Sequence, residues 1–190
     1  MHTPEINFTV RDLPDLSSYV VIVTGGNSGI GYETTKQLAL RHARVYIASR
    51  SRDRVDAAIR KMRDETARNL DVRFLQIDLN DLRSVTAAAE TFSTLEPRLD
   101  LLFNNAGVMN VPMSFTGDGY ETQWQVNYLA PFVFVAKLLP LMLHTASISS
   151  SKDRVRVVNV TSDLAINIGP KTIDLDDVNM SGRKGLMAPM

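Results

Sequence analysis

The stretch Thr24-Gly25-Gly26-Asn27-Ser28-Gly29-Ile30-Gly31 decides the fold, because it directly follows an apolar run and directly precedes a segment of helical length. Between a strand and a helix, such a loop has a physical purpose. Gly25 permits the tight turn, Gly29 lets backbone amides approach a pyrophosphate, and Gly31 lets the helix pack on the strand. The loop therefore predicts a dinucleotide-binding unit. The alternative is an ordinary glycine-rich turn, which the flanking strand and helix disfavour.

Apolar, β-rich runs recur along the chain with helical segments between them. They predict strands at Tyr19–Thr24, Arg44–Ala48, Val72–Ile77, Leu99–Phe103 and Val155–Val160. Helices are expected to begin near Ser28, Ser51, Asp81 and Asp118, with Ser51 and Asp81 as N-terminal caps. Because the strands are continuously apolar, helices should cover both faces of a parallel sheet. The predicted fold class is α/β, a doubly wound parallel sheet.

The composition fits one domain over residues 1–190, with an N-terminal extension at 1–17 and a loop-like tail at 166–190. Hydrophobic residues make up 44% of the chain, and a domain of this size buries about 70% of its unfolded surface. The 21 basic residues balance the 21 acidic ones, so neither nucleic acid nor a membrane is an expected partner.

The absence of cysteine excludes disulfides, thiolate metal sites and a cysteine nucleophile. The histidines are too scattered to predict a metal site: His2, His42 and His144. The first 19 residues are charged and lack the apolar run of a secretory signal, which favours a cytoplasmic protein. Polar residues and prolines interrupt the apolar stretch Val126–Leu143, so it is expected to be a buried helix and not a membrane span.

The spacing of the glycine loop resembles that of the short-chain dehydrogenase/reductase family, and further motifs follow in the family's order. Asn104-Asn105-Ala106-Gly107 ends the fourth predicted strand, as the family's Asn-Asn-Ala-Gly motif does. Asp78 ends the third strand, where the family contacts adenine. The resemblance covers roughly Leu16 to Ser162 and implies a Rossmann sheet with strand order 3-2-1-4-5. It also implies a nicotinamide dinucleotide held by Gly25, Asn27, Ser28, Gly29, Ile30, Gly31, Asp78, Leu79, Asn105, Ala106 and Gly107.

The end of the second strand predicts which dinucleotide is bound. A carboxylate there favours the ribose diol of NAD, and a basic residue favours the 2′-phosphate of NADP. This strand ends in Ala48-Ser49-Arg50, so Arg50 predicts NADP through its planar guanidinium. The alternative is that Arg50 only faces water. Lys137 is a second candidate for cofactor contact, although a lysine stem lying along an apolar helix face is the favoured explanation.

The resemblance assigns catalytic roles to Ser162 and Asn127. In the family, the serine binds the substrate oxygen and the asparagine helps hold a water relay to a lysine. The alternatives are that Ser162 caps a loop and that Asn127 satisfies backbone groups in a kinked helix. The family's proton donor is a tyrosine in a Tyr-x-x-x-Lys motif after the serine, and this chain has none there. Tyr32-Glu33-Thr34-Thr35-Lys36 matches the letters, but it lies on the helix after the glycine loop and is interpreted as a coincidence.

The sequence therefore favours an NADP-dependent oxidoreductase acting on the carbonyl or alcohol of a hydrophobic small molecule, shortened before the catalytic tyrosine and impaired in activity. A catalytically silent dinucleotide-binding or interaction module is the alternative, so the sequence leaves open whether this chain is an active enzyme. A methyltransferase fits the glycine loop but not Asn104–Gly107. Apolar surface is expected to remain on helix 126–143 and strand 155–160, which favours self-association.

Overall fold

The computed structural model describes residues 9–151, 153–162 and 176–179. In this part of the chain, five strands form one parallel sheet in the order β3-β2-β1-β4-β5. Their bounds are β1 Val20–Thr24, β2 Arg44–Ser49, β3 Val72–Gln76, β4 Leu101–Asn104 and β5 Arg156–Asn159. The predicted fold class, strands and strand order are all confirmed, with strand ends that differ by one or two residues.

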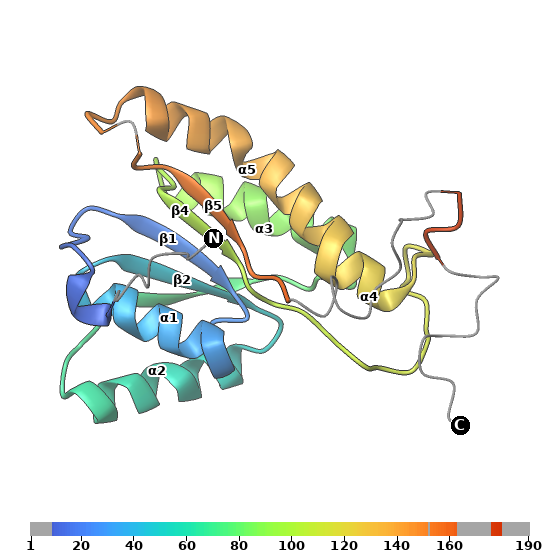
Figure 1. Cartoon of the computed structure of the whole chain (residues 1–190), viewed down its shortest axis with the longest axis horizontal. Coiled ribbons are helices and arrows are strands. Elements are labelled where there is room, and N and C mark those ends of the chain that lie inside the picture. The colour runs from blue at the N-terminus through green and yellow to red at the C-terminus, as the bar shows by residue number, and fades with distance from the viewer. Residues whose placement is uncertain (1–8, 152, 163–175, 180–190) are drawn as a thin grey trace, which may run out of the picture.

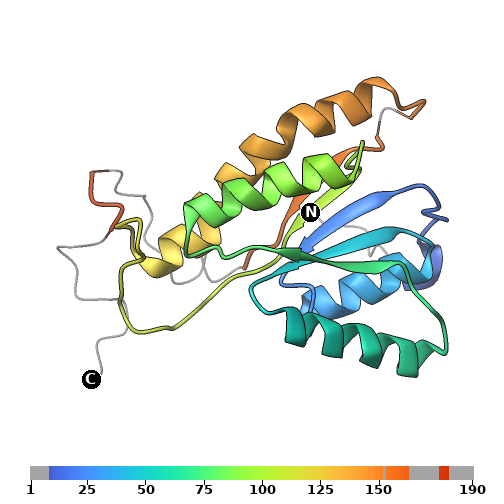
Figure 2. The same cartoon turned by 180° about the vertical axis from the view of Figure 1, so that it is seen from behind.

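Helices lie on both faces of the sheet, with α1 and α2 on one side and α3 and α5 on the other (Figures 1 and 2). Their bounds are α1 Gly29–Leu40, α2 Arg52–Thr66, α3 Leu82–Leu95, α4 Thr122–Trp124 and α5 Ala130–Ser147. A short 3-10 helix, η1, spans Val10–Asp12, and a π-helix, η2 (Gln125–Leu129), joins α4 to α5.

Alternate residues of the central strand enter different cores, because successive side chains of a strand point to opposite faces. Val20 and Ile22 of β1 pack with residues of α3 and α5, whereas Val21 and Val23 pack with residues of α1. All five residues of β1 are buried. Burial on both faces explains why this strand lacks the alternating pattern of a half-exposed one.

Two of the predicted helix starts are capped as expected. Ser51 accepts a hydrogen bond from the backbone N–H of Arg54, and Asp81 accepts from Arg83 and Ser84. The start expected near Asp118 is wrong, because α4 begins at Thr122 with Glu121 as its N-cap. Asp118 lies before it in a turn, where its carboxylate accepts from the backbone N–H of Leu82.

The apolar stretch Val126–Leu143 is helical, but only one side of it is buried. Phe134 and Leu138 are fully buried, whereas Phe132 and Leu143 are each 61% exposed. Among the described residues, one helical run, Thr122–Ser147, is long and apolar enough to cross a membrane by length and composition. By that measure, the polar residues and prolines within Val126–Leu143 do not exclude a span, and 28% of the run's apolar window is buried against this domain.

The carboxyl-terminal part of the described chain forms the edge of the sheet. β5 pairs with β4, and all four of its residues are exposed. The expectation that strand 155–160 and helix 126–143 carry exposed apolar surface is confirmed for Val157, Val158, Val160 and the outer side of α5. Most of the predicted tail at 166–190 lies outside the described residues.

Candidate functional site

The glycine loop has the backbone conformation that its sequence predicts. Gly25 and Gly29 have φ angles of +66° and +54°, a region that side chains with a Cβ avoid. A Cβ on Gly31 would lie 2.4 Å from Nδ2 of Asn105 and 2.6 Å from the carbonyl oxygen of Gly25. Gly31 therefore serves close packing between α1 and the sheet. Gly29 has no atom of its surroundings within 4 Å of where a Cβ would stand, so the space beside it is open.

The amino end of α1 presents backbone amides without a side-chain cap. Ser28 has the extended backbone of an N-cap residue but makes no side-chain hydrogen bond to the helix. The first-turn bond runs from the N–H of Tyr32 to the carbonyl of Ser28, at 3.0 Å. The preceding N–H groups of the first turn have no carbonyl partner within the helix, which is the usual state of a helix start. These amides and the helix dipole favour an anion at this position.

A cavity of about 490 Å³, here called the glycine-loop cavity, lies beside this helix start at the carboxyl ends of β1, β2 and β3. Ligands of open α/β sheets bind at this end of the strands. The cavity brings together eight of the predicted cofactor residues: Gly25, Asn27, Ser28, Arg50, Asp78, Leu79, Ala106 and Gly107. Of the other candidates, Gly31 and Asn105 pack behind it, Ile30 is 71% exposed, and Gly29 borders open space.

Sequence reasoning missed Arg54, which lines the glycine-loop cavity together with Arg50. Both side chains are exposed. Arg54 lies in the first turn of α2, the helix that directly follows the second strand, and this position beside the strand's carboxyl end is the signal available in the sequence. Two guanidinium groups at one cavity make a strong site for a phosphate.

The Asn104–Gly107 motif is held against the first strand. Oγ1 of Thr24 accepts hydrogen bonds from the backbone N–H groups of Asn105 and Ala106, both at 3.0 Å. Nδ2 of Asn105 donates to the carbonyl of Thr24 at 2.9 Å. Because Ala106 also contacts the position of a Cβ on Gly25, the motif fixes the shape of the glycine loop.

A second cavity of about 850 Å³, here called the Ser162 cavity, contains both candidate catalytic residues, Ser162 and Asn127. It shares Ala106, Gly107 and Val108 with the glycine-loop cavity, so the two cavities adjoin. Its apolar walls include Met109, Tyr128, Pro131, Phe132, Val135, Val157 and Val160. Its polar groups come from α4, from the ends of β4 and β5 and from the residues just after those strands: Gln123, Asn104, Asn105, Asn159 and Thr161.

Asn127 lies in the π-helix and uses its side chain to hold the loop after β4. Its Oδ1 accepts from the N–H of Val108 at 2.8 Å, and its Nδ2 donates to the carbonyl of Val108 at 2.7 Å. Single π-turns within helices occur frequently at functional sites. Asn127 therefore satisfies backbone groups, which is the alternative to a catalytic role. These groups are the N–H and carbonyl of Val108, in the loop that both cavities share.

The Tyr32-x-x-x-Lys36 match points away from both cavities. The Tyr32 hydroxyl donates to a carboxylate oxygen of Glu65 at 3.0 Å, and Lys36 pairs with Glu33 and Glu65. Burial and the Glu65 carboxylate raise the pKa of Tyr32 above its usual value. A catalytic tyrosine needs a lowered pKa, so Tyr32 does not fit that role. Tyr32 and Lys36 of α1 both bind Glu65 of α2 and so join the two helices.

Lys137 is exposed on α5 and lines neither the glycine-loop cavity nor the Ser162 cavity.

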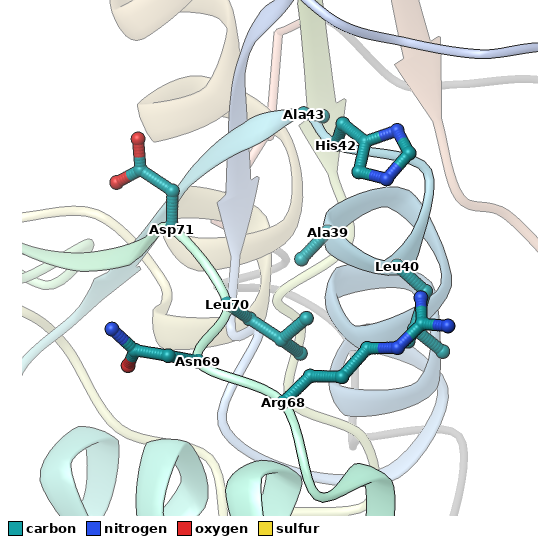
Figure 3. A pocket seen from close by; sticks show the side chains of 8 residues that line it. All are labelled: Ala39, Leu40, His42, Ala43, Arg68, Asn69, Leu70 and Asp71. Atoms are coloured by element: carbon teal, nitrogen blue, oxygen red, sulfur yellow. The ribbon is translucent and has the colours of Figure 1, made fainter.

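A groove at the opposite end of the sheet, shown in Figure 3, contains none of the predicted site residues. It is lined by Ala39, Leu40, His42, Ala43, Arg68, Asn69, Leu70 and Asp71, next to the amino ends of β2 and β3. Within the described residues, no group of three or more His, Asp or Glu side chains could hold a metal ion.

Comparison with known proteins identifies the family. The model of the short chain dehydrogenase family matches residues 19–173. The chain is 46% identical over 170 residues to the short-chain dehydrogenase/reductase drtF of Aspergillus calidoustus, covering 88% of this chain and 54% of that protein. It is 44% identical over 154 residues to human retinol dehydrogenase 12, covering 81% and 46%. The chain spans about half the length of the curated relatives it matches.

Solved structures agree with these sequence matches. A protein of uncharacterised function from Mycobacterium paratuberculosis superimposes with a TM-score of 0.75 at 35% identity, over 93% of this chain and 57% of that one. The Pseudomonas aeruginosa RhlG/NADP complex superimposes with a TM-score of 0.66 at 26% identity, over 87% and 61%.

Proposed function

Because this chain belongs to the short-chain dehydrogenase/reductase family, we propose that it binds NADP(H) in the glycine-loop cavity and serves hydride transfer to or from a hydrophobic small molecule in the Ser162 cavity. The observation that carries this proposal is the shared wall of the two cavities, Ala106 to Val108. A cofactor on one side of that wall and a substrate on the other would meet at it.

The residues present fit a phosphorylated dinucleotide. The uncapped amides of α1 and the open space beside Gly29 suit the pyrophosphate, and Arg50 with Arg54 suits a 2′-phosphate. The NADP complex of RhlG supports the same cofactor for a structural relative. When bound, the cofactor supplies or accepts the hydride, and the protein supplies its position and surroundings.

The Ser162 cavity fits an apolar substrate with one oxygen function. Its walls include Tyr128, Phe132 and Val135, while Ser162 supplies a hydroxyl for the substrate oxygen. Asn127 keeps the Val108 loop in place between substrate and cofactor. The relative named retinol dehydrogenase 12 supports an apolar alcohol or carbonyl as the substrate class.

A catalytically silent dinucleotide-binding module is the second candidate, and one observation favours it. The residues that line the Ser162 cavity include Tyr128 but no lysine. The Tyr128 ring stacks on Phe132, with ring centroids 6.5 Å apart, and lies 4.5 Å from the ring of Trp124. Within the described residues, this cavity therefore has no lysine beside a tyrosine, as the family's pair requires. Oxidation of NADPH with a panel of apolar ketones and aldehydes separates the candidates: turnover that Ser162→Ala abolishes supports the oxidoreductase, and saturable binding without turnover supports the silent module.

Arg50→Ser is expected to weaken NADPH binding about ten- to hundredfold while leaving NADH binding within about twofold. The reason is the loss of charge-assisted hydrogen bonds to a 2′-phosphate, which contribute about 1.5–3 kcal/mol. Titration of the chain with each nucleotide, followed by nucleotide fluorescence, measures both effects. Arg52→Ser is the matched control, because Arg52 pairs with Asp56 and does not line the cavity. Equal affinities of the Arg50 and Arg52 variants for NADPH would rule out the assigned phosphate contact.

Self-association through the outer side of α5 and the edge strand β5 is part of the proposal. Phe132, Leu139 and Leu143 are exposed along this helix, beside exposed valines of β5. Light scattering is expected to show a species larger than the monomer at micromolar concentration, and Phe132→Glu is expected to shift it toward monomer. A monomer at all concentrations would contradict self-association.

A cytoplasmic location stays a prediction.

A further inference from the structure

Gln125 is a fully buried polar residue that the proposed function does not use. It is the first residue of the π-helix. Its Nε2 donates to the carbonyl of Leu79 at 3.3 Å and to Oδ2 of Asp118 at 2.8 Å. Its Oε1 accepts from the hydroxyl of Thr116 at 2.6 Å. One side chain thus joins the segment after β3, the turn before α4 and the π-helix itself.

The ends of this network reach the walls of both cavities. Leu79 lines the glycine-loop cavity. Asn127 lies two residues after Gln125 on the same π-helix, lines the Ser162 cavity and holds Val108 by two hydrogen bonds. Asp118 also accepts from the N–H of Leu82 at the start of α3, which anchors the turn to the segment that contains Leu79. The hydrogen bond between Gln125 and Leu79 and the two between Asn127 and Val108 are therefore linked by a short piece of π-helix backbone.

We propose that Gln125 is a positioning residue that couples the two cavities. This inference rests on the proposed binding of NADP(H). A nucleotide packed against Leu79 restricts that segment, and the buried amide of Gln125 transmits the restriction to the π-helix. The contact between Asn127 and Val108 is then stabilised on the substrate side. Buried polar networks suit this purpose, because every member must keep its partner and few alternative arrangements are available.

Hydrogen exchange of the Val108 amide measures the coupling, since Asn127 is its acceptor. NADPH is expected to slow this exchange by about tenfold or more in the unaltered chain. Thr116→Val removes the hydroxyl that Gln125 accepts from but keeps the shape, and Gln125→Met removes the whole amide. In both variants, the slowing by saturating NADPH is expected to fall below about threefold.

Thr116→Ser is the matched control, because it keeps the hydroxyl and should restore the full slowing. A purely structural role would raise Val108 exchange by the same factor with and without NADPH, and would leave the ratio unchanged. If Gln125→Met does not fold, the Thr116 pair decides the question.

The outcomes separate this inference from the proposed function. Full slowing retained in Thr116→Val, or no slowing in an unaltered chain that binds NADPH saturably, overturns the coupling and leaves the proposed function standing. An unaltered chain with no saturable NADPH binding overturns both.

Discussion

Gly31→Ala should reduce NADPH affinity about ten- to hundredfold and lower the free energy of unfolding by about 1–3 kcal/mol. The added Cβ would stand 2.4 Å from Nδ2 of Asn105 and 2.6 Å from the carbonyl oxygen of Gly25. The second neighbour is backbone, so the clash cannot be relieved by rotating a flexible side chain. Either the helix start moves away from the glycine loop, or the loop loses the shape that places its amides.

The same substitution breaks the loop's attachment to β4. Displacing Asn105 removes its hydrogen bond to the Thr24 carbonyl. Urea denaturation and NADPH titration measure the two effects. Gly117→Ala is the matched control, because Gly117 has no surrounding atom within 4 Å of a Cβ and needs no positive φ. Unchanged NADPH affinity in Gly31→Ala would show that the cofactor does not depend on this loop.

The local structure around the candidate site follows directly from neighbouring residues, and the sequence predicts it. The glycine loop, the strand that precedes it and the caps Ser51 and Asp81 depend on neighbouring residues, and these were readable from spacing and residue type. The carboxyl ends of parallel strands lie at one edge of the sheet. Correctly ordered strands therefore placed Arg50, Asp78 and Ala106 around one cavity.

The parts that depend on contacts between distant segments were not predicted. The side chain of Asn127 binds Val108, 19 residues away, and Gln125 binds Leu79, 46 residues away. Such pairs have no local sequence pattern, so both roles of Asn127 stay open at the level of sequence and Gln125 has no predicted role. Lys137 is the reverse case: the sequence leaves a cofactor contact open for it, but it is exposed on α5 and lines neither cavity.

Asp100→Ala is expected to lower the free energy of unfolding by about 3–5 kcal/mol, because it removes a fully buried carboxylate from two arginines. Its oxygens accept from Nε and Nη2 of Arg98, at 3.0 and 2.7 Å, from Nε of Arg154, and from the backbone N–H of Val20 at 2.8 Å. The substitution would leave these donors without their acceptor at the amino ends of β1, β4 and β5.

The position of β5 links this ion cluster to the candidate site. Arg154 also donates to the carbonyl of Ser18 and lies 4.1 Å from the ring centroid of Tyr19, so it fastens the edge strand to the start of β1. At its other end, β5 leads to Asn159 and Ser162 on the wall of the Ser162 cavity. Loss of Asp100 should therefore loosen the edge strand and expose its amides to hydrogen exchange before the rest of the sheet.

Urea denaturation of Asp100→Ala, Asp100→Asn and Asp56→Ala tests this account. Asp100→Asn keeps the volume and one acceptor oxygen, so it should lose less than Asp100→Ala. Asp56 makes an exposed pair with Arg52 at 3.7 Å, and its loss should change the free energy of unfolding by less than about 0.5 kcal/mol. If Asp100→Ala unfolded at the same urea concentration as Asp56→Ala, the buried cluster would not be what holds β5 to the sheet, and the wall that contains Ser162 would need another anchor.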